Sequence, residues 1–234
     1  RFAFLKSSTV FFHNNDDLSI FKNRRIVKNN GLVIPGSGVN LIDFNFNKSI
    51  NEEKNIIKFI FIGRMIKDKG IEDLLKAAKK LVKKYDSFKL YIVGGFDDNN
   101  NASINKNYLN SFLLKDKIIY LGEKKNIKEI LNTFDCLILP SYREGCSKAI
   151  LEAGACGLPV ITNDVPGCNN IIIDGYNGLL SKPKDVDSLY HSIAKFSMLS
   201  YESRLNMGIK MHEHIIDNFD ENIVISKYIS EINS

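Results

Sequence analysis

The 234 residues are 44% hydrophobic and 25% charged, as expected of a globular protein with enough apolar material for a core. No apolar run approaches the roughly 20 residues that a helix needs to span a bilayer, and the first residues lack the features of a signal peptide. The net charge of +5 is spread along the chain as lysine pairs without interleaved aromatic residues. This pattern argues against nucleic-acid binding and is compatible with a weak attraction to an anionic membrane surface.

The four cysteines predict free thiols rather than disulfides or a zinc site. None forms a C-x-x-C pair, and no histidine lies at zinc-ligand spacing from them. Cys136 falls in an apolar run and Cys156 among small residues, so we expect both to be buried. Together with the lack of a leader sequence, these thiols favour a reducing cytoplasm. Because Arg1 begins the chain in the middle of an element, we also expect a piece of a longer protein.

The first forty residues predict a strand, a helix and a second strand. These elements are Thr9–Phe12, Asp16–Phe21 and Leu32–Ile34. Asn14 and Asn15 are both candidates for the N-cap of the helix, because a side-chain amide oxygen can accept from the first free backbone N–H groups. The run Pro35-Gly36-Ser37-Gly38 predicts a connection to the rest of the chain.

From residue 56 onward, apolar runs alternate with helical patterns. Strands are expected at Ile56–Ile62, Leu90–Val93, Ile118–Leu121, Cys136–Leu139, Val160-Ile161 and Gly178–Leu180. Helices are expected at Ile71–Tyr85, Asn105–Leu114, Ile127–Phe134, Ser147–Cys156, Val186–Leu199 and Glu221–Ile232, with a short helix or turn after Pro166. Such alternation with short connections predicts an α/β fold in which helices cover both faces of a parallel sheet.

A basic loop follows the first strand of this series. It reads Gly63-Arg64-Met65-Ile66-Lys67-Asp68-Lys69-Gly70 and leaves the carboxyl end of the strand, where open α/β sheets bind their ligands. Gly63 would let a ligand approach the backbone closely, and Arg64 and Lys69 together could neutralise a diphosphate. A solvated basic loop before a helix explains the same residues. Neither a G-x-G-x-x-G motif nor a P-loop is present.

Two glutamates define a second candidate site. Glu144 lies in the loop after Cys136–Leu139, and Glu152 lies eight positions later in the helix that begins near Ser147. Two carboxylate acceptors beside a helix N-terminus suit a ligand with both a phosphate and hydroxyl groups. The alternative is a capping charge and a solvated helix residue. Against that alternative, Glu152 stands among apolar and small residues, where an unpaired carboxylate is costly.

The stretch from Pro140 to Ile161 closely resembles the glutamate-pair motif of the retaining GT-B glycosyltransferases of family four. Other runs similar to this family are Asn14-Asn15-Asp16-Asp17…Phe21, Ile34-Pro35-Gly36-Ser37-Gly38-Val39, Thr162-Asn163-Asp164-Val165-Pro166-Gly167-Cys168 and Asp174-Gly175-Tyr176-Asn177-Gly178. The resemblance extends from about Thr9 to Leu199 and is densest at 63–70 and 141–178. We interpret Pro166-Gly167 and the run from Asp174 as structural turns.

By this resemblance the chain is the carboxyl-terminal, donor-binding portion of a GT-B enzyme with a Rossmann-like fold. Residues 1–40 would be the end of an amino-terminal Rossmann-like domain with the interdomain connection, and 41–215 the nucleotide-sugar-binding domain. Residues 216–234 would form a helix that crosses back to the amino-terminal domain. Because the family's acceptor pocket lies in that amino-terminal domain, we expect this portion alone to transfer no sugar.

The resemblance also implies roles for individual residues. Arg64 and Lys69 occupy the diphosphate-binding positions, Glu144 approaches the hydroxyls of the donor sugar, and Glu152 takes the ribose. The resemblance therefore implies that Arg64, Lys69 and Glu144 are catalytic residues. The donor-binding residues would be Gly63, Gly145, Cys146, Ser147 and Glu152, with the amides of 145–147 facing the sugar and phosphates. No metal ion and no other cofactor are expected.

The implied reaction transfers a sugar from a nucleoside-diphosphate sugar, expected to be UDP-linked. The acceptor would be a glycan or a polyprenyl-diphosphate-linked sugar in polysaccharide or glycoconjugate biosynthesis. We expect this reaction in the cytoplasm or at the inner face of the membrane, with a peripheral membrane contact. Two alternatives stay open: a nucleotide-sugar epimerase of similar architecture, and a non-catalytic nucleotide-binding subunit.

Other chemistries find little support in the sequence. Asp97-Asp98 could suggest a metal-binding pair, but it lies in an Asn-rich loop. His212 and His214 are two positions apart and so do not share one helix face. Ser141 and Ser147 do not stand in a G-x-S-x-G elbow with a nearby histidine. We therefore expect neither a metal site nor a hydrolase triad.

Overall fold

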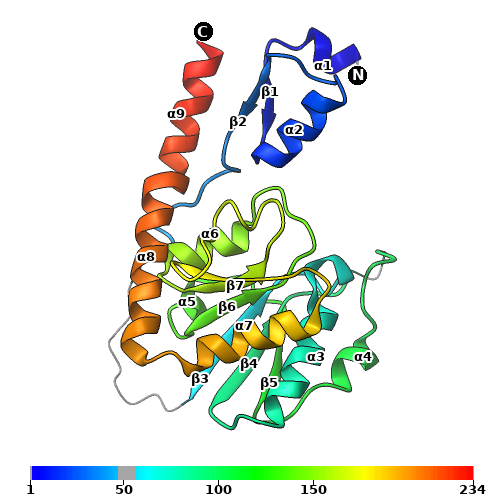
Figure 1. Cartoon of the computed structure of the whole chain (residues 1–234), viewed down its shortest axis with the longest axis vertical. Coiled ribbons are helices and arrows are strands. Elements are labelled where there is room, and N and C mark those ends of the chain that lie inside the picture. Colours follow the sequence, from blue (N-terminus) through cyan, green and yellow to red (C-terminus); the bar gives the residue numbers. More distant parts are fainter. Residues whose placement is uncertain (1, 47–55, 98, 234) are drawn as a thin grey trace.

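The structure, a computed structural model, describes residues 2–46, 56–97 and 99–233. A small amino-terminal unit lies above a larger α/β unit, and two consecutive helices run along both of them (Figure 1). These helices are α8 (Tyr201–Phe219) and α9 (Glu221–Ile232).

In the described part of the chain, the larger unit is built on a parallel sheet of six strands in the order β5-β4-β3-β6-β7-β8. The strands are β3 (Ile57–Ile62), β4 (Phe88–Val93), β5 (Ile118–Gly122), β6 (Cys136–Leu139), β7 (Val160–Asn163) and β8 (Gly178–Ser181). The chain adds strands outward from β3 on one side and outward from β6 on the other. The strand order therefore reverses between β3 and β6, and such a switch point is where open α/β sheets bind ligands.

The strands form from short runs that are mostly apolar. All residues of β6 and β7 are buried, because helices cover both faces of the sheet. The prediction of an α/β fold with a parallel sheet is confirmed. The predicted strand bounds lie within two residues of the observed ones. The largest differences are at the start of β4, Phe88 instead of Leu90, and at the end of β7, Asn163 instead of Ile161.

The helices of the larger unit lie on both faces of the sheet. They are α3 (Ile71–Val82), α4 (Lys106–Asn110), α5 (Lys128–Leu131), α6 (Lys148–Ala155) and α7 (Val186–Met198), with a 3-10 turn, η1 (Lys67–Lys69), before α3. Helix α3 packs beside α7, while α6 packs against α8 (Figure 1). Leu74, Leu75, Ala78 and Leu81 of α3 are buried, as their helical spacing predicts.

Helices α4 and α5 are shorter than predicted, and local hydrogen bonds explain both differences. The predicted helix Asn105–Leu114 ends at Asn110, because Leu114 instead forms an antiparallel bridge with Ile118. The predicted helix Ile127–Phe134 ends at Leu131, where the hydroxyl of Thr133 donates to the Ile130 carbonyl at 2.7 Å. Such side-chain bonds offer the backbone an alternative to the helical pattern.

Helices α1 (Phe2–Lys6) and α8 are absent from the sequence prediction. Helix α8 begins after Ser200, whose side chain accepts from the Ser203 amide, and continues without a break through residues 215 and 216. Its buried residues Met211 and Ile215 lie against Gly154 of α6, where an added Cβ would be 2.4 Å from Met211 Cε. The division of the chain at 1–40, 41–215 and 216–234 stays a prediction.

The amino-terminal unit consists of α1, α2 (Asn15–Asn23) and the parallel pair β1 (Val10–Phe12) and β2 (Gly31–Val33). Helix α9 lies beside it: the Thr9 hydroxyl donates to Glu231, and the rings of Phe11 and Tyr228 meet edge-on at 4.8 Å. The connection after β2 joins the start of α9 through the bridge between Val39 and Asp220. The chain therefore passes between the two units at two adjacent points.

Candidate functional site

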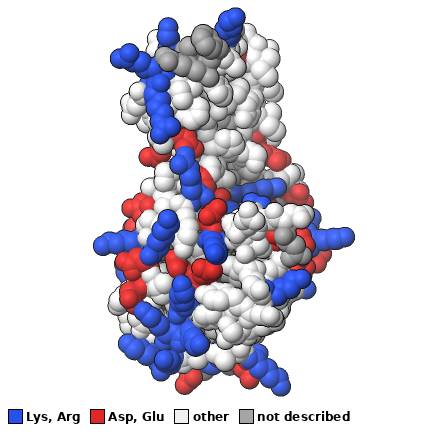
Figure 2. All heavy atoms as spheres, turned by 90° about the vertical axis from the view of Figure 1, so that its right-hand side faces the viewer, with Lys and Arg blue, Asp and Glu red and all other residues white. Residues whose placement is uncertain are grey.

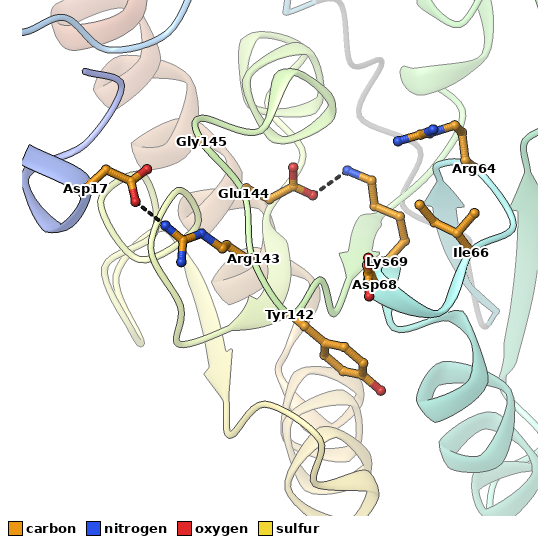
Figure 3. A pocket seen from close by; sticks show the side chains of 9 residues that line it. All are labelled: Asp17, Arg64, Ile66, Asp68, Lys69, Tyr142, Arg143, Glu144 and Gly145. Atoms are coloured by element: carbon orange, nitrogen blue, oxygen red, sulfur yellow. Dashed lines mark hydrogen bonds and ion pairs between the residues drawn. The ribbon is translucent and has the colours of Figure 1, made fainter. Parts of the chain in front are cut away.

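A cavity of about 570 Å³ opens at the switch point of the sheet, between the larger unit and α2. Its lining comes from the loop after β3, the loop after β6, and α2 (Figure 3). The lining residues are Asp17, Arg64, Ile66, Asp68, Lys69, Tyr142, Arg143, Glu144 and Gly145. Residues of two candidate sites therefore meet in one cavity. These sites are the basic loop 63–70 and the loop of Glu144, which lie in separate parts of the sequence.

Lys69 and Glu144 form an ion pair in this cavity. Lys69 Nζ lies 2.5 Å from Glu144 Oε1, and the two side chains are only 23% and 12% exposed. The Ser141 hydroxyl donates to the same Glu144 oxygen at 2.7 Å. Figure 3 shows the ammonium and the carboxylate pointing directly toward each other in the cavity. Lys69 has further N–H donors, so it can keep this pair and still contact an anion.

The backbone of the Glu144 loop is held by the ends of neighbouring strands. Asn163, which is 2% exposed at the end of β7, donates its side-chain amide to the carbonyls of Pro140 at 2.7 Å and Ser141 at 3.1 Å. The Glu144 amide donates to the Pro166 carbonyl at 3.2 Å. Gly167 has a φ of +81°, and a Cβ there would lie 2.2 Å from the Glu144 carbonyl oxygen. The turn at Pro166-Gly167 therefore packs directly against the backbone of the candidate catalytic residue.

Arg64 extends from the end of β3 over the cavity. Its guanidinium lies 3.4 Å from the Asp97 carboxylate, and its side chain is 60% exposed. In Figure 3 the guanidinium points toward the Lys69–Glu144 pair. An exposed arginine with one long ion pair is free to accept an anion in its planar fork. Asp98, the neighbour of Asp97 in the Asn-rich loop, lies outside the described residues.

Glu152 lies on α6 and is not among the residues that line the cavity. Its side chain is 15% exposed, and Lys148, one helical turn earlier, lies 3.7 Å away. Burial raises the pKa of Glu152 above its ordinary value, and Lys148 offsets part of this shift. The charged form of Glu152 is thus short of stabilising partners, as expected of a carboxylate that needs a ligand.

Of the other predicted donor-binding residues, the structure places one in the lining of the cavity and three outside it. Gly145 lines the cavity, whereas Gly63, Cys146 and Ser147 do not. The Ser147 amide donates to the Gly167 carbonyl at 3.3 Å, and Cys146 packs against Gly36 of the connection after β2. A Cβ on Gly94 would lie 1.8 Å from the Gly63 carbonyl oxygen, so at Gly63 the close backbone approach is to the loop after β4.

Sequence reasoning missed several lining residues. Asp17 of α2 pairs with Arg143, and Tyr142 donates its hydroxyl to Asp73 at 2.8 Å. Arg143 adjoins a predicted site residue, which was a usable signal. Nothing in the local sequence places Asp17 in the same cavity, because 126 positions separate it from Arg143.

The cavity presents charges of both signs. Arg64, Lys69 and Arg143 are its cations, and Asp17, Asp68 and Glu144 are its carboxylates. Figure 2 shows charged side chains of both signs gathered at the waist between the two units. Guanidinium and ammonium groups suit a diphosphate, whereas carboxylates accept hydrogen bonds from hydroxyls. One ligand with phosphates and hydroxyls would match both sets.

Among residues 2–46, 56–97 and 99–233, no group of three or more His, Cys, Asp or Glu side chains could hold a metal ion. The expectation that donor binding needs no metal stays a prediction. Each helix in the described part of the chain is too short or too polar to cross a membrane. In the described part of the chain no cysteine forms a disulfide, and Cys136 and Cys156 are buried as predicted.

The fold defines a Rossmann-like α/β protein of the GT-B class. The structure of HepE from Anabaena in complex with UDP superposes with a TM-score of 0.84 at 17% identity, over 97% of this chain and 64% of that one. The sequence profile of the family "Glycosyl transferases group 1" matches residues 42–214. The chain belongs to this family.

Two curated relatives act on lipid-linked sugars according to their names. N,N'-diacetylbacillosaminyl-diphospho-undecaprenol alpha-1,3-N-acetylgalactosaminyltransferase of Campylobacter jejuni is 29% identical over 98% of this chain and 61% of its own length. UDP-Gal:alpha-D-GlcNAc-diphosphoundecaprenol alpha-1,3-galactosyltransferase of Escherichia coli is 29% identical over 80% of this chain and 50% of its own length. The chain thus spans about half to six-tenths of these relatives.

Proposed function

We propose that this chain is the donor-binding portion of a retaining glycosyltransferase of family four. The whole protein would transfer a sugar from a UDP-linked donor to a polyprenyl-diphosphate-linked or glycan acceptor in polysaccharide or glycoconjugate biosynthesis. The observation that carries this proposal is the meeting of Arg64, Lys69 and Glu144 in one cavity at the switch point of the sheet. Membership of the glycosyl transferases group 1 supports the reaction class, and the names of two relatives support the acceptor class.

The cations of the cavity suit the donor diphosphate. Arg64 is exposed and directed over the cavity, so its planar fork can take two phosphate oxygens. Lys69, from the same loop after β3, adds a second positive charge beside Glu144. When the bond between the sugar and the diphosphate breaks, negative charge grows on the leaving diphosphate, and both side chains stabilise it.

The carboxylates suit the sugars of the donor. Glu144 is fixed by Lys69 and Ser141 through one oxygen, Oε1, which leaves the orientation of the carboxylate well defined. We assign it to the hydroxyls of the donor sugar. Glu152 is assigned to the ribose, whose two hydroxyls would stabilise its charged form by about 1.5–3 kcal/mol for each hydrogen bond. Retention would follow from attack on the same face as the leaving diphosphate, without a protein nucleophile.

The two alternatives fit the findings less well. A nucleotide-sugar epimerase would share the architecture, but the matched family is one of glycosyl transferases. A non-catalytic nucleotide-binding subunit could also bind UDP in this cavity, but it would leave Arg64 and Glu144 without a role in turnover. The lipid-linked acceptors in the relatives' names support action at a membrane surface, which we propose to be the inner, cytoplasmic face.

The test is Arg64→Ala in the full-length protein, with Arg24→Ala, at the exposed residue directly after α2, as the matched control. UDP release from UDP-galactose and UDP-N-acetylgalactosamine is measured with a polyprenyl-diphosphate-linked sugar as acceptor, and the anomeric configuration of the product is determined by NMR. We expect Arg64→Ala to lower turnover roughly 100-fold, as for other donors to a developing charge, with unchanged folding. Unchanged turnover and donor affinity would overturn the assignment, and an inverted product would overturn retention.

A further inference from the structure

The start of α2 holds the two residues that flank Glu144. On one side, the guanidinium of Arg143 pairs with the Asp17 carboxylate. On the other side, the Asn14 side-chain amide donates to the Gly145 carbonyl at 2.9 Å. Figure 3 shows Asp17 and Arg143 facing each other, with Glu144 turned the opposite way toward Lys69.

Asn14 is well suited to hold this loop in place. It is 1% exposed, and its Oδ1 accepts from the Asp17 amide at 2.8 Å, which makes it the N-cap of α2. Its Nδ2 donates both to Gly145 and to Asp17 Oδ2, at 3.1 Å. Both ends of one buried side chain are therefore used, and its orientation is fixed from two sides. The ion pair of Arg143 is more exposed, so it contributes less.

A third contact joins the same two parts of the molecule. Gly36, in the connection after β2, has a φ of +65°, and a Cβ there would lie 2.8 Å from Cys146 Cβ. The backbone of the connection thus packs on the loop residue that follows Gly145. Arg143 and Gly145 thus contact the amino-terminal unit and Cys146 contacts the connection that follows it, while Glu144 between them faces the cavity.

We propose that Asn14, supported by Asp17, is a positioning residue for Glu144. It fixes the loop so that the carboxylate faces the sugar of the donor, and this inference rests on the proposed function. The residues of α2 belong to the amino-terminal unit, whereas the donor cations belong to the larger unit. The geometry around the donor sugar therefore depends on how the amino-terminal unit sits against the loop.

The central variant is Asn14→Ser in the full-length protein. Serine is as good an N-cap as asparagine, but its shorter side chain cannot cap α2 and also reach Gly145. Affinities for UDP, UDP-galactose and UDP-N-acetylgalactosamine are measured by calorimetry. We define the affinity ratio as the affinity for the tighter-binding of the two UDP-sugars divided by the affinity for UDP. We expect Asn14→Ser to bind UDP as the wild type does, while its affinity ratio falls about 3- to 10-fold, which corresponds to the loss of one hydrogen bond. We also expect the turnover number of this variant to fall by a larger factor than the factor by which its KM for the acceptor changes.

The matched control is Asn105→Ser. Asn105 caps α4 through the Asn107 amide and is not among the residues that line the cavity. It should change neither the affinity ratio nor turnover. If Asn14→Ser does not fold, Asn14→Asp serves instead, because it keeps the cap and replaces the Nδ2 donor by an acceptor. Its affinity ratio should recover as the pH falls, since the protonated carboxyl can donate to Gly145 again.

A double-mutant cycle with Glu144→Gln separates this inference from the proposed function. If Asn14 acts through Glu144, Asn14→Ser has little further effect in the Glu144→Gln background. An unchanged ratio in Asn14→Ser, or effects that simply add, would overturn the positioning role. If Glu144→Gln alone leaves donor affinity and transfer unchanged, the proposed function itself fails.

Discussion

Lys69 and Glu144 hold opposite charges that are both largely shielded from water. Each therefore depends on the other in the ligand-free protein, because a partly buried charge that loses its partner has little solvent to replace it. In the proposed complex the ammonium would face the donor diphosphate as well. The same lysine then serves both the folded state and the reaction.

Lys69→Met tests both roles. We expect a loss of about 1–3 kcal/mol in the free energy of unfolding, because Glu144 is left with only the Ser141 hydroxyl. We also expect at least a 100-fold loss of turnover, since a charge next to the leaving group disappears. Urea unfolding and UDP-release assays measure the two effects. Lys76→Met, at an exposed position of α3, is the control and should change neither. Full activity in Lys69→Met would contradict the role of this side chain.

Glu152 shows how a binding residue can lower the stability of the ligand-free protein. Its pKa is raised by burial above the ordinary value of 4.5. Between pH 4.5 and the raised pKa, Glu152 is therefore protonated in the folded state but already ionised in the unfolded state. Stability contributed by Glu152 is present below this window and is lost as the pH rises through it.

Glu152→Gln should remove this pH dependence. We expect a higher melting temperature than the wild type at pH 7–8, a gain that shrinks toward pH 4.5, and weaker UDP binding because a carboxylate acceptor for the ribose is lost. Differential scanning calorimetry across this pH range and calorimetric titration with UDP are the measurements. Glu213→Gln, at an exposed position of α8, should show neither effect. A variant as stable as the wild type at every pH would show that burial of Glu152 costs nothing.

At the scale of elements, the turn after β7 shapes the Glu144 loop. Gly167→Ala would bring a Cβ to 2.2 Å from the Glu144 carbonyl oxygen, at a φ that L-residues avoid. The conformation alone costs about 1–2 kcal/mol, and the overlap with the loop adds to it. We expect a larger loss of stability than this and a loss of turnover. Thermal unfolding and UDP release measure them.

Gly175 offers the matched comparison for this glycine. It has a similar φ of +74°, but nothing lies within 4 Å of the position of its Cβ. Gly175→Ala should therefore cost only the conformational part and leave turnover intact. Equal losses in Gly167→Ala and Gly175→Ala would mean that the contact with Glu144 is unimportant.

The sequence predicts the strands well, because apolar runs are a local pattern. Apolar runs define β3 and β6, and the topology of a parallel sheet brings their carboxyl ends to one edge. Helix ends are less predictable: Leu114 continues a helical pattern but pairs with Ile118 in the fold. The role of Asn163 in holding the loop depends on a strand neighbour that local sequence does not specify.

At the scale of the whole molecule, the amino-terminal unit and the larger unit are joined by few elements. The connection after β2 meets the start of α9 at Val39 and Asp220, and α9 then runs along β1. A Cβ on Gly38 would lie 2.6 Å from Glu221 Cα, so the two crossing segments are packed backbone to backbone. We therefore expect α9, through β1, to influence where α2 sits, and the start of α2 in turn contacts the Glu144 loop.

Tyr228→Ala should loosen this arrangement without unfolding the sheet. The edge-on contact between Tyr228 and Phe11 is lost, and such pairs contribute roughly 0.5–1.5 kcal/mol beyond their buried area. We expect faster amide hydrogen exchange in β1, α2 and β2, with unchanged protection in β3 and β6. Tyr176→Ala, at an exposed tyrosine of the larger unit, is the control and should leave exchange in β1, α2 and β2 as it is. If α9 sets the position of α2, Tyr228→Ala transfers sugar more slowly but keeps its affinity for UDP. If instead hydrogen exchange in α2 and sugar transfer are both unchanged, the amino-terminal unit is held independently of α9.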